Sequence, residues 1–135
     1  MALTKALRNS AIVIEKYVDL PASADTTVGV SVPAGTLIIA AGFEPSEAVT
    51  DVTTYTMDIT DGTTTFANDL NFDNTAAGTI KVGTTAGLVS AADTVDVVTT
   101  ITGSPGIISG RLFVVAVDVN ESRLQANEVD RDTLA

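Results

Sequence analysis

The feature that most constrains the fold of this chain is a series of short segments in which apolar and polar residues alternate. AIVIEKYVDL and TVGVSV both follow this pattern, and each is followed by a turn signal, at Pro21 and at Pro33-Ala34-Gly35. A period of two residues is that of a half-buried β-strand. The apolar positions predicted to share a face are Ile12, Ile14, Val18 and Leu20 in the first segment, and Val28, Val30 and Val32 in the second.

Composition supports the same fold class. The chain has 135 residues, of which 45% are hydrophobic but only 4% aromatic, so its apolar mass is mainly Val, Ile, Leu and Ala. Val, Ile and Thr suit the pleated surface of a sheet. About eight short strands with turn signals every 8–12 residues, and no amphipathic helical period, predict an all-β protein. We expect a jelly-roll-like antiparallel β-sandwich of about eight strands with a short N-terminal arm.

The chain divides into a single predicted domain and two polar ends. Residues 1–10 form an N-terminal arm, residues 11–120 the β-sandwich, and residues 121–135 a polar C-terminal tail. The arm is either an ordinary frayed terminus or a docking segment, and the tail is expected to be mobile. The apolar run AIVI is too short for a signal-peptide core or a membrane span, so we expect neither.

Two segments are apolar on both faces. TLIIAAGF predicts a central strand that is covered on both sides. RLFVVAVDVN predicts a final strand whose inward residues are Phe113, Val115, Val117 and Val119. Its other face carries Leu112, Val114 and Ala116, which pack either between subunits or against the second sheet of the same domain. We take the subunit interface as the prediction and leave the second possibility open.

Residues 51–70, DVTTYTMDITDGTTTFANDL, contain four aspartates but predict a hairpin. Asp61-Gly62 between alternating segments is typical of a two-residue type I′ turn. In that register Met57 opposes Phe66 on the core side, and Asp58 opposes Thr65 on the solvent side. The aspartates would then lie at the tip and on the solvated face.

Charge and missing residue types exclude several functions. The net charge of −10 and the pI of about 4.1 disfavour binding to nucleic acid and to anionic membranes. The chain has neither His nor Cys, which removes imidazole bases, thiolate nucleophiles and the usual zinc ligands. We expect no enzyme activity and no cofactor.

Two patterns of acidic residues could indicate a metal site or a catalytic pair. The loop Asp69-Leu70-Asn71-Phe72-Asp73 has oxygen ligands at alternate positions, but it lacks the following Gly and the closing Glu of a calcium loop. The pairs Glu44 with Glu47 and Asp93 with Asp96 match glycosidase acids by residue type only. The chain has no Trp for sugar stacking. We therefore expect neither a metal site nor a catalytic pair.

Three stretches resemble small β-rich head proteins of tailed bacteriophages, namely the capsid decoration or cement proteins. They are DLPASADTTVGVSVPAGTLIIAAGFEPSEA, DITDGTTTFA and AADTVDVVTTITGSPGIISGRLFVVAVDV, and the resemblance extends from about residue 17 to about residue 120. It implies a jelly-roll-like domain, often trimeric, that clamps capsomers from outside, and it carries no catalytic residues.

The predicted function follows from that resemblance. The chain would bind the major capsid protein on the outer surface of the virion head and stabilise the shell as a homotrimer. The predicted shell contacts lie in the arm, at Leu3, Lys5, Leu7 and Arg8. The alternatives are a carbohydrate-binding β-sandwich and another virion component, such as a tail or fibre subunit.

Overall fold

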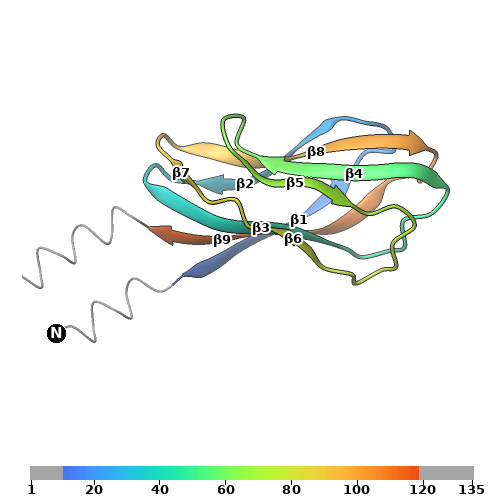
Figure 1. Ribbon diagram of the computed structural model, residues 1–135, viewed down its shortest axis with the longest axis horizontal. Helices are drawn as coiled ribbons and strands as arrows, with labels where there is room; N and C mark the ends of the chain where they lie inside the picture. Colours follow the sequence, from blue (N-terminus) through green and yellow to red (C-terminus); the bar gives the residue numbers. More distant parts are fainter. Residues whose placement is uncertain (1–10, 119–135) are drawn as a thin grey trace, which may run out of the picture.

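The computed structural model describes residues 11–118, which form two antiparallel β-sheets packed face to face (Figure 1). The first sheet contains β1 (Ile12–Leu20), β9 (Ile108–Asp118), β3 (Thr36–Pro45) and β6 (Lys81–Gly83) in that order, and β7 (Gly87–Val89) also pairs with β3. The second sheet contains β2 (Thr26–Val32), β8 (Asp93–Gly103), β4 (Val52–Thr60) and β5 (Thr65–Asn71) in that order. The described residues contain no helix, so the prediction of an all-β sandwich is confirmed.

The strand count exceeds the sequence-based one by a single short element. β7 is a strand of three residues that pairs with β3. Only Val89 is buried, and Leu88 points outward. The central position predicted for TLIIAAGF is confirmed, because β3 pairs with β9 on one side and with β6 and β7 on the other. The predicted cover on both faces is wrong, because Ile39 is 37% exposed.

The core lies between the two sheets and is built from branched aliphatic side chains with a few aromatic ones. Phe43 of β3 and Phe72, just after β5, meet edge to face, with ring centroids 5.8 Å apart and planes at 89°. This is a favoured geometry for an aromatic pair. The largest fully buried side chains are Tyr55, Phe43, Phe66, Phe72, Leu20, Ile38, Met57, Ile59, Ile108, Leu112 and Val49.

The two faces of β9 are the reverse of the predicted ones. Leu112, Val114 and Ala116 are 0–1% exposed and belong to the core. A Cβ added to Gly29 of β2 would lie 2.3 Å from Cδ2 of Leu112, so Leu112 reaches the opposite sheet of the same chain. These three side chains therefore cannot pack between subunits. The second possibility left open above, cover by the other sheet, is the one observed.

A bulge explains why one predicted core residue is exposed. The register between β2 and β8 shifts between Thr27 and Val30. A β-bulge adds one residue to a strand and so reverses the alternation of its side chains beyond that point. Val30 and Val32 are buried as predicted, whereas Val28 is 59% exposed.

The hairpin of residues 51–70 exists, but its predicted turn and register are wrong. β4 and β5 are joined by four residues, 61–64, and the pairs are Thr60 with Thr65, Ile59 with Ala67 and Met57 with Leu70. Oδ1 of Asp61 accepts hydrogen bonds from the backbone N–H groups of Thr63 and Thr64, at 2.8 and 2.7 Å. These hydrogen bonds from the backbone to the Asp61 side chain favour the four-residue loop over the predicted two-residue turn.

Candidate interaction surface

The aspartates of the hairpin are used to shape backbone turns. Oδ1 of Asp58 accepts a hydrogen bond from the N–H of Asp69 at 2.7 Å, and Oδ1 of Asn71 accepts one from the N–H of Asp73 at 2.8 Å. Asp73 itself accepts the N–H of Tyr55. In the residues that the structure describes, no three acidic side chains converge as a metal site would require. The side-chain oxygens of Asp69, Asn71 and Asp73 therefore accept hydrogen bonds from nearby groups of the same chain.

A small depression lies beside the hairpin tip. Its volume is about 140 Å³, and its lining includes Asp61, Leu88 and Asp93. Small-molecule sites usually enclose roughly 300–1,000 Å³. Both carboxylates are already engaged, because Asp93 accepts the N–H of Thr94 just as Asp61 accepts those of its own turn. This depression is therefore a poor candidate for a ligand site.

The outer face of the first sheet carries a larger and more unusual feature. β9 places Phe113, Val115 and Val117 there, and all three are partly exposed. The register aligns Val13 of β1 with Val115, and Leu37 of β3 with Val117. We call the combined surface the apolar patch; it consists of Val13, Leu37, Ile39, Ala40, Val82, Leu88, Phe113, Val115 and Val117.

Exposure distinguishes the apolar patch from ordinary surface. Val13 is 58% exposed, Leu88 51% and Val82 45%, and they lie on three different strands of one sheet. Isolated apolar side chains on a surface need no explanation, but a contiguous patch of them marks a site of interaction. The sequence of β9 predicts two apolar faces, and the face expected inside is the one that lies outside.

An ion-pair network bounds the apolar patch on one side. Arg111 of β9 lies between Glu15 of β1, at 2.7 Å, and Glu44 of β3, at 3.3 Å. The hydrogen bond to Glu15 is the main reason that the pKa of Arg111 is raised above its ordinary value. The guanidinium carbon also lies 5.3 Å from the centroid of Phe113, so the network touches the apolar patch directly.

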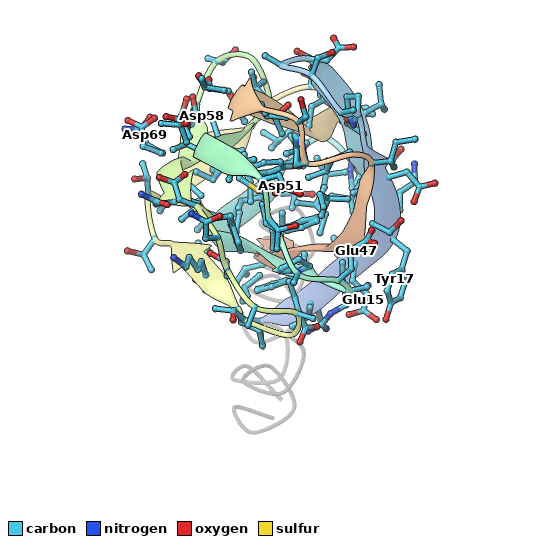
Figure 2. The ribbon with its side chains drawn as sticks, turned by 90° about the vertical axis from the view of Figure 1, so that its right-hand side faces the viewer. Glu15, Tyr17, Glu47, Asp51, Asp58 and Asp69 are labelled. Atoms are coloured by element: carbon cyan, nitrogen blue, oxygen red, sulfur yellow. The ribbon has the colours of Figure 1, made fainter. Side chains whose placement is uncertain are left out.

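Besides Glu15 and Glu44, which border the apolar patch, the described surface carries many carboxylates elsewhere. Figure 2 looks along the sandwich and shows Glu15 and Glu47 on one side and Asp58 and Asp69 on the other. The basic side chains of residues 11–118 already have partners, since Lys16 donates to the carbonyl of Gly29 and Lys81 to that of Asn71. The described surface outside the patch is thus predominantly acidic.

The outer face of the second sheet is polar. β4 and β8 place Thr54 opposite Thr102 and Thr56 opposite Thr100, and all four side chains point away from the core. We call this surface the threonine face. Asp58 and Asp96 also lie on it, and Val98 is its one partly buried aliphatic residue on β8. It is an ordinary solvated face of an antiparallel sheet.

Tyr55 is the one buried polar side chain in the described ranges whose side-chain oxygen has no hydrogen-bond partner. It comes from the inner face of β4 and is fully buried. Burial, with a smaller contribution from the charge of Glu47, raises the pKa of Tyr55 to about 12. The neutral phenol is therefore strongly favoured in the folded protein.

Comparison with known proteins gives structural matches only. No protein-family model matches the chain, and no curated protein matches its sequence. A chain of the cyanophage Pam1 capsid asymmetric unit is 17% identical, with a TM-score of 0.58, and the match covers 80% of this chain and 84% of that one. A chain of the acid-stable capsid of Helicobacter pylori bacteriophage KHP30 is 13% identical, with a TM-score of 0.53, over 80% of this chain and 91% of that one.

These similarities establish that the sandwich has the fold of chains found in phage capsids. The four arm residues predicted to contact a shell, Leu3, Lys5, Leu7 and Arg8, lie outside the described residues. No helix in the described residues has the length and hydropathy that a membrane-spanning helix needs.

Proposed function

We propose that this chain is a structural protein of a bacteriophage head that binds the outside of the assembled shell and stabilises it by bridging capsomers as a homotrimer. The observation that carries the proposal is the match to two capsid chains over most of their length, 84% and 91%. The similarity involves the whole sandwich, so this domain and those chains share one architecture. Because identity is low, the support comes from the fold.

We also interpret the sandwich as a jelly roll. Strands β1 to β4 alternate between the two sheets, and β7, β8 and β9 do so again. Such crossing connections are typical of the double-sheet jelly rolls that occur in viral capsid domains. The interpretation agrees with the architecture that the sequence resemblance implies.

The N-terminal arm is the proposed contact with the shell. Residues 1–10 contain Lys5 and Arg8 and no carboxylate, whereas the chain as a whole has a net charge of −10. Leu3 and Leu7 would add apolar contacts. The proposed partner is the major capsid protein, and neither a cofactor nor catalysis is part of the role.

Shell stabilisation would follow from mass action. A protein that binds only the assembled lattice lowers the free energy of that lattice relative to its dissociated subunits. A trimer presents three arms at once, so modest single contacts combine through effective concentration. This mechanism requires neither a deep pocket nor a reactive side chain.

Cryo-electron microscopy of emptied phage heads incubated with the purified chain tests the proposal. We expect density for the sandwich at repeated positions on the outer surface, and its absence at saturating protein would refute the proposal. Deletion of residues 2–9 is expected to abolish binding while leaving the β-sheet circular dichroism spectrum unchanged. Unimpaired binding by that variant would exclude the arm as the anchor.

A carbohydrate-binding module is the second candidate, and one residue favours it. Tyr17 of β1 is an aromatic side chain that is 71% exposed. A glycan array would reveal micromolar binding that is lost in Tyr17→Ala. Specific glycan binding without shell binding would replace the proposed function with this one.

A further inference from the structure

We infer that the apolar patch on the outer face of the first sheet is the surface through which one copy of this chain docks on a second copy. The inference deepens the self-association part of the proposed function and rests on it. It also replaces the interface predicted from the sequence, because Leu112, Val114 and Ala116 are buried inside the chain. The outward neighbours of those residues on β9 are Phe113, Val115 and Val117.

Three neighbouring strands make the central part of the apolar patch continuous. Across the first sheet, Val13 pairs with Val115, and Val115 in turn pairs with Ala40. One pleat further along, Phe113 pairs with Gly42, which pairs with Val82 of β6. Facing pairs on one side of a sheet have Cβ atoms within about 5 Å of each other, so these side chains form one surface.

Packing at Gly42 shows that Phe113 lies flat against the sheet. A Cβ added to Gly42 would lie 2.6 Å from Cζ of Phe113 and 2.6 Å from the carbonyl oxygen of Lys81. The ring therefore occupies the space above the glycine backbone. Phe113 thus lies between the ion-pair network of Arg111 and the aliphatic side chains of the patch, and aromatic residues of this kind are enriched in interfaces.

Charge makes this face the one at which two copies repel each other least. With a net charge of −10, two copies repel one another wherever their carboxylates face each other. The apolar patch contains no ionisable side chain, and its nearest carboxylates, Glu15 and Glu44, are paired with Arg111. A basic partner would be drawn to the acidic surface elsewhere, whereas a like-charged copy meets least repulsion here.

The size of the patch indicates a weak contact. Four strands about 4.8 Å apart, over about five residues at 3.3 Å each, give roughly 300 Å². Standard interfaces bury about 800 Å² on each partner. Two copies that dock through this patch alone would therefore associate at high concentration only.

Sedimentation of the full chain at several concentrations tests the inference. We expect the wild type to form an oligomer, and Val13→Asp and Leu88→Asp, at two separate edges of the patch, to weaken association at least tenfold. Both positions are more than half exposed, so a carboxylate there is compatible with folding. Thr100→Asp adds the same charge to the exposed threonine face and is expected to leave association unchanged.

Four outcomes would overturn the inference, and the first three are a monomeric wild type at 100 µM, an oligomer that both patch variants leave intact, and equal weakening by Thr100→Asp. Val13→Thr removes apolar area without adding charge and should weaken association by a smaller factor, provided its melting temperature is unchanged. If deletion of residues 1–10 or 119–135 turns a monomer into an oligomer, a terminal segment covers the patch and the inference is wrong.

Shell binding is measured separately. An oligomer that dissociates in the patch variants but never binds emptied heads supports the inference and refutes the proposed function. A monomer that binds heads refutes the inference and the homotrimer part of the proposed function, and it supports shell binding alone.

Discussion

The outer faces of the two sheets differ although both belong to one sandwich of similar strands. The first sheet exposes Val13, Val82 and Leu88, while the second exposes paired threonines such as Thr56 and Thr100. Both faces are equally remote from the core, so the stability of the single chain does not require the difference. Polar side chains such as threonine are sufficient on a face that contacts only water. The second sheet exposes a single large aliphatic side chain, Val28 at 59%, whereas the first sheet groups several, so its outer face is the stronger candidate for a surface that contacts another protein.

The largest expected effect contrasts the inner and outer sides of the first sheet. Leu112→Ala removes a fully buried side chain and should lower the free energy of unfolding by about 3 kcal/mol. Val115→Thr, on the outer side of the same strand, should lower it by less than about 1 kcal/mol. Urea denaturation at low protein concentration measures both. Equal losses would mean that β9 has no distinct outer face.

The next effect tests how closely Phe113 packs over the backbone on the outer side of the first sheet. Gly42→Ala places a methyl group against the ring of Phe113 and the carbonyl of Lys81, and it should cost about 2 kcal/mol of stability. It should also displace Phe113 and weaken association. Gly78 has open space around the position of an added Cβ, although its φ of +80° favours glycine. Gly78→Asn, a residue that tolerates positive φ, therefore serves as the control, with little change expected in either measurement.

The second sheet contains a buried phenol that makes stability depend on pH. The pKa of Tyr55 is raised from 10.0 to about 12, so the folded state holds its proton more tightly than the unfolded state. Stability from this group is complete below pH 10 and falls as the pH rises toward 12, by about 1.4 kcal/mol at pH 11.

Tyr55→Phe isolates that contribution. Denaturation from pH 8 to pH 11 should show a shallower loss of stability in the variant, because its ring cannot ionise. Identical pH profiles for the two proteins would show that the phenol is not held in the neutral form by the fold.

The smallest effect is expected on the threonine face. Thr100→Ala removes an exposed hydroxyl and should change the free energy of unfolding by no more than about 0.5 kcal/mol. Association should also be unchanged. A loss of association in this variant, measured by sedimentation beside the wild type, would assign an interaction to the second sheet as well and remove the contrast between the two faces.

The sequence predicted the fold class because alternation and turn residues are local signals. β1, β2 and β3 are found where the sequence placed them, and β3 is central as its continuous apolar character predicted. The candidate surface was predicted only in part. The sequence identified β9 as apolar on both faces, yet chose Leu112, Val114 and Ala116 for the outside.

Two misjudged features, besides the faces of β9, share a cause, which is that side-chain direction depends on neighbours distant in sequence. Val28 is exposed because a bulge against β8 shifts the register between Thr27 and Val30. Gly29 within TVGVSV is the one local signal of that bulge, since an isolated glycine in a strand often marks one. The hairpin register differs from the predicted one because the loop has four residues and not two. Each local pattern was compatible with more than one arrangement.

By itself, the sequence determined that this chain is an acidic, all-β protein without His or Cys, since composition and period-two alternation require nothing beyond the chain. It also determined which residues of β9 share a face. Only the tertiary structure decided which face is buried, because a strand can turn over without any change in its alternation. The space between the sheets accepts Leu112 beside Gly29, and this packing leaves Phe113, Val115 and Val117 outside.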